Sequence, residues 1–135
     1  MKYGHTLTHE NARKYFVLEV IHLLGRFASL SFPTIAVVNK AAVGGGCMLS
    51  FAHDYIFVKD KAFFSSPEID LSFPIPEGMN EILKLKNKSF KAHRDMCLFG
   101  KRFHEKEALK LGMIDGIIQN LEKVMEKANQ ISKYG

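Results

Sequence analysis

The chain has 135 residues, a hydrophobic content of 47% and a formal net charge of +5. This length and composition predict a single folded domain over residues 1–135 and exclude a largely disordered protein. No apolar stretch is long enough to span a membrane, and no basic run is interleaved with aromatic residues, so neither a membrane span nor nucleic-acid binding is expected. The two cysteines have neither metal-ligand spacing nor the pattern of a disulfide framework, so no metal site is expected.

The first third of the chain predicts a helix followed by a buried strand. Apolar side chains recur at steps of three or four residues after Thr8, which is a candidate helix cap. Pro33 bars continuation of this helix, and the apolar run that follows it is typical of a strand buried on both faces. We expect strands at 35–38, 55–58 and 62–65, and a short helix at about 46–52.

The remainder of the chain alternates in the same way. A loop is expected over 67–76, a segment with three prolines, and a fourth strand over 113–118. Helices are expected over 77–85, 90–99, 103–111 and within 119–135, where one face is apolar. Strands that alternate with helices predict an α/β protein with a small, largely parallel sheet surrounded by helices.

Two features of the sequence suggest chemistry. Gly44, Gly45 and Gly46 lie between a strand and a helix, where bare N–H groups can hold an anion or a developing oxyanion. Glu68 follows Pro67 just after the third strand, and a carboxylate beside such donors can move a proton next to a carbonyl. Taken alone, the glycines are also compatible with a tight structural turn, and Glu68 with a solvated loop residue.

Several motifs, in this order, resemble the crotonase superfamily of enoyl-CoA hydratases and isomerases. The resemblance implies a partial crotonase-like core and is strongest between residues 33 and 70. Within the family, His53-Asp-Tyr and Ile69-Asp-Leu most resemble the plant-type peroxisomal delta-3,delta-2-enoyl-CoA isomerases. The motifs that carry the resemblance are Pro33–Asn39, Ala41–Cys47, His53–Tyr55, Ala62–Ile69 and Lys106–Asp115.

The resemblance implies roles for individual residues. Members of the superfamily bind an acyl-CoA thioester and hold its enolate oxygen with two backbone N–H groups, of which Gly45 would supply one and the first half of the fold the other. Glu68 corresponds to the catalytic glutamate that hydratases and isomerases share. Met48 stands where hydratases carry another glutamate, and it can also be a core or pocket side chain. The substrate would be bound around Gly44, Gly46, Met48 and Pro67, with no cofactor beyond the coenzyme A of the substrate.

The implied reaction is the shift of a 3-enoyl to a 2-trans-enoyl thioester in fatty acid beta-oxidation. Hydration uses two carboxylates to hold and activate water, whereas one carboxylate can take the C2 proton and return it at C4. Two alternatives stay open: an enoyl-CoA hydratase, and a truncated, non-catalytic homologue that acts as an interaction or structural protein, because family members are longer.

The resemblance also implies an assembly and a location. Family members form homo-oligomers, trimers or hexamers, and residues 119–135 are the expected contact. The implied location is the peroxisome, or otherwise the cytoplasm, because no targeting signal is visible in the chain.

Overall fold

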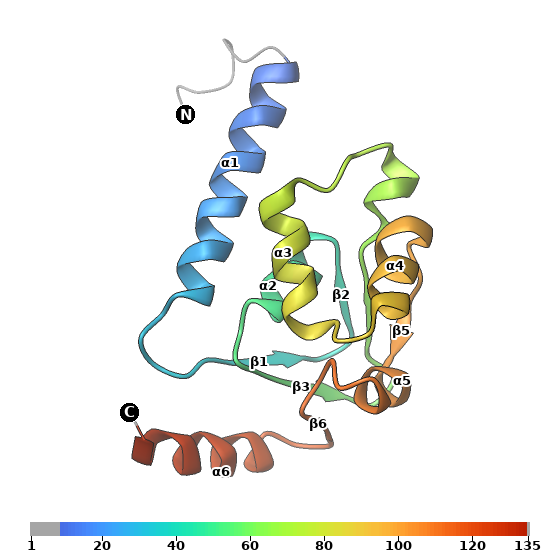
Figure 1. Ribbon diagram of the computed structural model, residues 1–135. Helices are drawn as coiled ribbons and strands as arrows, with labels where there is room; N and C mark the ends of the chain where they lie inside the picture. Colours follow the sequence, from blue (N-terminus) through green and yellow to red (C-terminus); the bar gives the residue numbers. More distant parts are fainter. Residues whose placement is uncertain (1–8, 135) are drawn as a thin grey trace.

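The computed structural model describes residues 9–134, so the expected helix cap Thr8 lies outside the described residues (Figure 1). The helices are α1 (His9–Ala28), α2 (Gly45–Phe51), α3 (Glu77–Lys86), α4 (Phe90–Phe99), α5 (Glu105–Lys110) and α6 (Glu122–Ile131), with 3₁₀ turns η1 (Pro67–Leu71) and η2 (Ser132–Tyr134). The strands are β1 (Ile35–Val38), β2 (Ala41–Val43), β3 (Tyr55–Lys59), β4 (Phe63–Ser65), β5 (Phe103–His104) and β6 (Gly116–Ile118). The expected α/β class, with small parallel sheets and surrounding helices, is confirmed.

The strands form two three-stranded sheets. One has the order β1-β3-β6 and is parallel throughout, with Ile35 opposite Tyr55. The other has the order β2-β4-β5, in which β2 and β4 are parallel and β4 and β5 antiparallel. The expectation of one sheet that included the strand near 63–65 is therefore wrong, because β4 pairs with β2 and β5.

Three strands and one turn differ from the expected elements. β6 covers only Gly116–Ile118 of the strand predicted over 113–118. β2 was not expected, and β5 takes the first two residues of the segment predicted as a helix over 103–111. The predicted loop over 67–76 begins with the 3₁₀ turn η1. Strands of two or three residues are too short to show a period of two in the sequence, so pairing with a neighbour decides their conformation.

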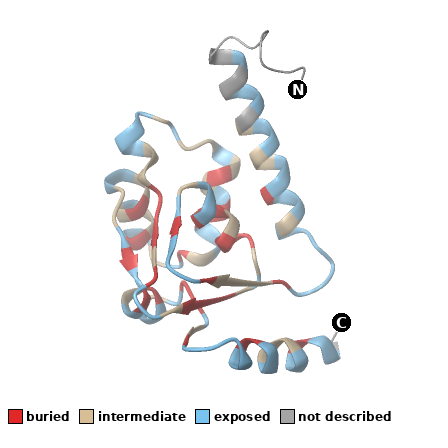
Figure 2. Cartoon of the chain, turned by 180° about the vertical axis from the view of Figure 1, so that it is seen from behind, coloured by how far each residue is buried: buried red, intermediate tan, exposed pale blue. Residues whose placement is uncertain are grey.

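The sheet β1-β3-β6 is covered on both faces by different partners. Side chains alternate between the two faces of a strand, so each strand contributes to both layers. On one side of the sheet, Val124 of α6 packs in a cluster with Ile35, Val37, Tyr55, Phe57 and Ile118. The opposite side joins the main core with α1, α2 and α3 through Ala36, Val38, Ile56 and Val58. Figure 2 shows the buried residues of α6 on the side that faces the sheet.

The starts of β1 and β3 are joined by a reciprocal set of hydrogen bonds. Thr34 donates from its backbone N–H and from Oγ1 to Asp54 Oδ2, each at 2.8 Å. The N–H of Asp54 donates back to Thr34 Oγ1 at 3.0 Å. Burial raises the pKa of Asp54, but the hydrogen bonds from Thr34 outweigh it, so the pKa lies below its ordinary value.

We expect Asp54→Ala to lower the free energy of unfolding by about 1 kcal/mol at pH 7, because hydrogen bonds to a charged acceptor are lost at a solvent-accessible site. A carboxyl with a lowered folded-state pKa stabilises the fold above its unfolded-state pKa of about 3.9, and loses that effect as the pH falls through the folded-state pKa. The difference in urea midpoint between Asp54→Ala and the parent chain should therefore shrink below about pH 4. Asp60→Ala, at an exposed turn position, is the control. A difference that is equally large at pH 7 and in strong acid would contradict this role of Asp54.

Candidate active site

The turn between β2 and α2 has an unusual backbone at Gly44. This residue has φ +55° and ψ −123°, a conformation that residues with a side chain rarely adopt. Its N–H donates to the carbonyl of Ser65 at 2.9 Å, and its carbonyl accepts from the N–H of Met48 at 3.1 Å. The backbone N–H of Gly44 is therefore already used inside the fold.

Gly45 and Gly46 form the first turn of α2, and both are exposed. The first N–H groups of a helix have no partner within the helix. Within residues 9–134, the N–H groups of Gly45 and Gly46 also have no hydrogen-bond acceptor outside the helix. This turn can therefore donate hydrogen bonds to an oxygen that carries negative charge.

The carboxylate of Glu68 lies against this turn. Glu68 is the second residue of η1 and is partly buried. Its Oε1 lies so close to Gly44 that a Cβ placed on Gly44 would be 3.1 Å from it. Its Oε2 accepts a hydrogen bond from Ser66 Oγ at 2.6 Å. The two features singled out in the sequence, the glycine turn and the carboxylate, are thus brought together.

The pairing of β2 with β4 explains this proximity. The strands are parallel, and Val43 lies opposite Ser65, so the residues that follow them leave the sheet at the same edge. The end of α4 supports η1 from the other side. Ser65 Oγ donates to the carbonyl of Gly100 at 2.9 Å, and a Cβ on Gly100 would lie 3.4 Å from Pro67 Cα.

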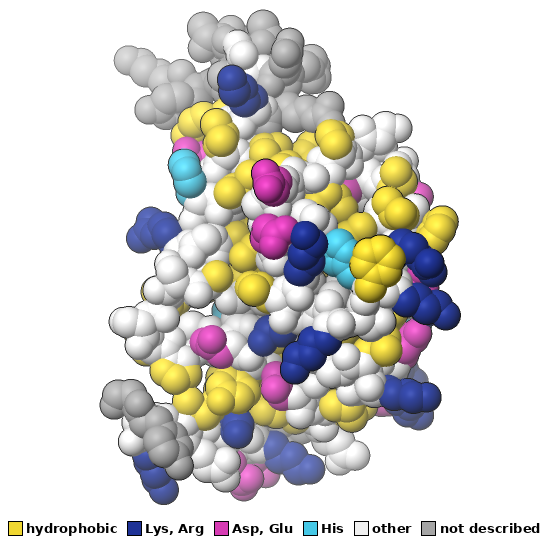
Figure 3. All heavy atoms as spheres, viewed as in Figure 1, with side chains coloured by type: hydrophobic (Ala, Val, Ile, Leu, Met, Phe, Trp, Pro, Cys, Tyr) yellow, Lys and Arg dark blue, Asp and Glu magenta, His cyan; other side chains and the backbone are white. Residues whose placement is uncertain are grey.

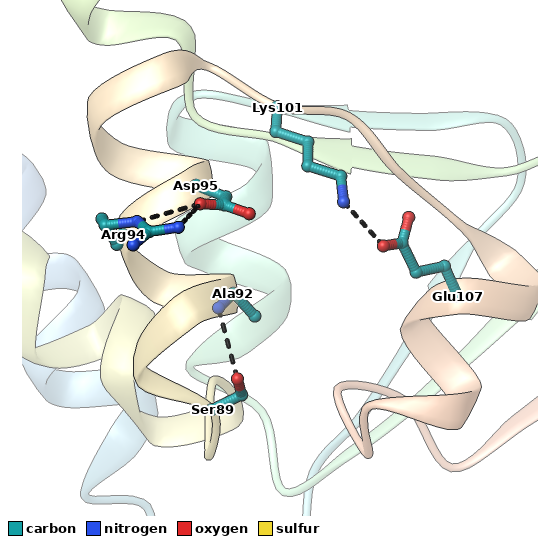
Figure 4. Close-up of polar contacts among 6 residues, drawn as sticks. All are labelled: Ser89, Ala92, Arg94, Asp95, Lys101 and Glu107. Carbon is teal, nitrogen blue, oxygen red and sulfur yellow. Dashed lines mark hydrogen bonds and ion pairs between the residues drawn. The ribbon is translucent and has the colours of Figure 1, made fainter.

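Helix α4 is held by polar contacts at both of its ends (Figure 4). Ser89 Oγ accepts a hydrogen bond from the N–H of Ala92 at 3.3 Å and so caps the helix. After the helix, Lys101 pairs with Glu107 of α5 at 2.7 Å. Both side chains of this pair are partly exposed, and ion pairs on a surface contribute little free energy, so the pair links the segment after α4 to α5 only weakly.

The two residues that follow the glycines are buried in the core. Cys47 and Met48 are 0% and 1% exposed and belong to the main hydrophobic core. Burial raises the pKa of the Cys47 thiol far above its ordinary value, and the negative charge of Glu68 adds to the rise. Cys47 is therefore a packed thiol.

An apolar hollow of about 320 Å³ adjoins η1. It is lined by Ile69, Phe73, Pro74, Ile75, Asn80, Cys97 and Leu98. Burial raises the pKa of the half-buried Cys97 to about 11, and the negative charge of Glu68 adds to the rise. Hydrophobic side chains also reach the surface over α3 and α4 (Figure 3).

A larger hollow lies away from the predicted site residues. Its volume is about 730 Å³, and it is lined by Asn39, Lys59, Asp60, Ile117, Ile118, Gln119, Asn120 and Lys123. These residues lie at or just after the carboxyl ends of β1, β3 and β6, except Lys123, which lies in α6. None of the residues predicted to bind substrate or to act in catalysis lines it, so its size does not make it the candidate active site.

Sequence reasoning did not identify two components of the site. One is Ser66, which is 0% exposed and holds Glu68. The available signal was its position two residues before the carboxylate, a spacing at which serine hydroxyls form local hydrogen bonds. The other is the apolar hollow, whose lining comes from η1, α3, α4 and the segment after η1. No local pattern predicts such a combination.

Comparisons with known proteins agree on one family. The sequence model of the enoyl-CoA hydratase/isomerase family matches residues 4–133. Enoyl-CoA delta isomerase 3 of Arabidopsis thaliana is 34% identical over 94 residues, which are 69% of this chain and 40% of that protein. Enoyl-CoA delta isomerase 2, peroxisomal, of the same plant is 32% identical over 95 residues, 70% of this chain and 40% of that protein.

The comparison of folds agrees with this match. The crystal structure of an enoyl-CoA hydratase from Thermoplasma volcanium superposes with a TM-score of 0.83 at 23% identity, over 93% of this chain and 50% of that chain. At this identity the superposition establishes the fold alone. The chain therefore spans half or less of the length of these relatives. Among the described residues, no helix is long and apolar enough to cross a membrane.

Proposed function

The chain belongs to the enoyl-CoA hydratase/isomerase family, and from this premise we propose that it takes part in the isomerisation of a 3-enoyl-CoA thioester to the 2-trans isomer. The observation that carries the proposal is the carboxylate of Glu68 beside a helix-start turn with free N–H groups. The delta isomerases of Arabidopsis thaliana support the choice of reaction.

The geometry supports a one-base mechanism. Glu68 Oε1 takes a proton from C2 of the thioester, and the negative charge spreads over a dienolate. The N–H of Gly45 binds the dienolate oxygen, with Gly46 in the same turn. The protonated carboxyl then returns the proton to C4, and the double bond lies between C2 and C3. The carboxylate is regenerated, so no other co-reactant is needed.

Hydration is the less favoured reaction for this site. Adding water requires a group that holds and activates it, and Met48 offers only a thioether in the core. Moving a double bond requires no water. Without a carboxylate at position 48, the site lacks one of the groups that hydration requires. Isomerisation does not require that group.

The acyl group of the substrate would lie in the hollow beside η1. The hollow is apolar, adjoins the segment that carries Glu68, and at about 320 Å³ is near the small end of ligand pockets. Cys97 and Leu98 of α4 form part of its wall. We propose that this hollow takes the first carbons of the acyl chain beyond the reacting double bond.

Assembly and location extend the proposal. Leu121 and Met125 are 56% and 60% exposed at the start of α6, which supports contacts between copies through residues 119–135. A peroxisomal location is supported by the Arabidopsis thaliana isomerase 2, whose name includes that compartment. The second N–H donor for the dienolate oxygen would come from the part of the family fold that this chain does not cover.

The test compares two reactions in two proteins. The first protein is the 135-residue chain. The second is a chimera in which the first half of a family member is fused to the N-terminus of this chain. We expect the chimera to convert 3-enoyl-CoA to 2-trans-enoyl-CoA, measured by the absorbance of the conjugated thioester, and to hydrate 2-trans-enoyl-CoA only weakly. The chain alone should be much slower, because a missing oxyanion donor costs about 100- to 1,000-fold in kcat.

The outcomes distinguish the alternatives. Efficient hydration by the chimera would identify a hydratase and contradict the proposal. A folded chimera that binds a CoA thioester and catalyses neither reaction would favour a non-catalytic family member. Binding is measured by calorimetry with a saturated acyl-CoA, which cannot react.

A further inference from the structure

Ser66 is a fully buried serine next to the candidate base. Its side chain is 0% exposed, and Oγ donates to Glu68 Oε2 at 2.6 Å. This distance is typical of a hydroxyl bound to an ionised carboxylate, a short and strong type of hydrogen bond. Ser66 directly follows β4, so the pairing of that strand with β2 fixes the backbone that carries the hydroxyl.

The hydrogen bond distinguishes the two oxygens of Glu68. Oε2 is held by Ser66, whereas Oε1 lies against Gly44, where a Cβ would be only 3.1 Å away. Because Gly44 has no side chain, the carboxylate can approach the turn this closely. Oε1 is thus the oxygen that lies against Gly44, the residue that directly precedes the free N–H groups of Gly45 and Gly46.

The hydroxyl of Ser66 is not used in the way that is usual for its position. Ser66 precedes η1 as its N-cap, where a serine side chain ordinarily accepts a hydrogen bond from a backbone N–H of the following turn. Its side chain makes no such cap hydrogen bond. Pro67, which follows, fixes the backbone angle at the start of the turn without help from a cap. The hydroxyl of Ser66 therefore donates its hydrogen bond to the Glu68 carboxylate and does not cap the turn.

We propose that Ser66 is a positioning residue, which holds one oxygen of Glu68 so that the other faces the glycine turn as the atom that takes and returns the proton. The proposal rests on the proposed isomerase function for its catalytic consequence. Its structural part, a Glu68 side chain held in one conformation by Ser66, can be measured without any activity.

The first experiment is nuclear magnetic resonance of the 135-residue chain labelled with ¹³C glutamate. Three-bond couplings report whether the Glu68 side chain occupies one rotamer or several. We expect one rotamer in the parent chain and in Ser66→Thr, which keeps the hydroxyl, and averaging over several in Ser66→Ala. Thr34→Val is the matched control, since Thr34 is also buried but its hydroxyl donates to Asp54 and not to Glu68.

The second experiment measures isomerisation in the chimera. Ser66→Ala should lower kcat by about 10- to 100-fold, because small displacements of a catalytic group have effects of that size, and should leave KM within about two-fold. Ser66→Thr should recover most of the rate. If the alanine variant does not fold, Ser66→Cys provides the same comparison, because a thiol is close in size and a weak donor.

Each result has a defined meaning. A single Glu68 rotamer in Ser66→Ala would overturn the proposal, and so would an unchanged kcat in an active chimera. An inactive parent chimera would contradict the proposed function, while the nuclear magnetic resonance comparison would still decide whether Ser66 positions Glu68. Loss of activity in Ser66→Ala through an increase in KM alone would assign Ser66 to substrate binding and overturn the positioning role.

Discussion

Glu68→Gln is expected to lower isomerisation by about 100- to 10,000-fold in the chimera, the range that general acid–base catalysis by one side chain supplies. Glutamine has nearly the same shape and can still accept a hydrogen bond from Ser66 Oγ. It cannot take a proton from C2, however, and cannot return one to C4. The loss should therefore appear in kcat, with KM and the stability of the fold little changed.

The matched control is Glu81→Gln on α3. The Glu81 side chain is 59% exposed and pairs with Lys84 on the same helix. The proposed reaction uses neither residue. We expect this variant to isomerise at the parent rate. A Glu68→Gln enzyme that keeps a tenth or more of the parent kcat would show that another group is the base.

Met48→Glu is expected to lower the free energy of unfolding by about 3–5 kcal/mol, the cost of an uncompensated charge in a protein interior. Met48 is 1% exposed and is surrounded by other buried apolar residues of the main core. That loss is a large part of the total stability of a typical domain, about 5–15 kcal/mol. The measurement is the urea midpoint and slope of the 135-residue chain, followed by circular dichroism.

Met48→Leu is the control, because it keeps the volume and the apolar character and should cost less than about 1.5 kcal/mol. The comparison also tests how position 48 relates to the chemistry. The resemblance to hydratases places a glutamate here, and in this chain the core closes over that position. A stable Met48→Glu variant with increased hydration would show that the side chain faces the substrate.

The elements with a clear sequence pattern were predicted well. The strands at 35–38 and 55–58 and the helix over 90–99 match β1, β3 and α4 closely. Each is long enough for apolar periodicity or a buried apolar run to be visible. The pairing of short strands was not predicted. β4 was assigned to the wrong sheet and β2 was not expected, because neither has a pattern that specifies its partner.

The candidate site, too, was predicted only in part from the sequence. The family resemblance predicted Gly45 as oxyanion donor and Glu68 as acid/base, and the structure brings their segments together. Their roles stay predictions. The resemblance singled out Gly45 as the donor and placed Gly44 and Gly46 around the substrate. In the structure the N–H of Gly44 donates to the carbonyl of Ser65, and those of Gly45 and Gly46 are free.

The sequence by itself determined the α/β class, the family resemblance and the kinds of groups available, because these depend on local periodicity and on short motifs. Only the tertiary structure decided which groups meet. The parallel pairing of β2 with β4 places Glu68 beside Gly44, and the packing of α2 turns Met48 into the core. Contacts between distant segments depend on register and packing, which are set by the whole chain. They produce no local sequence pattern in the residues that they join.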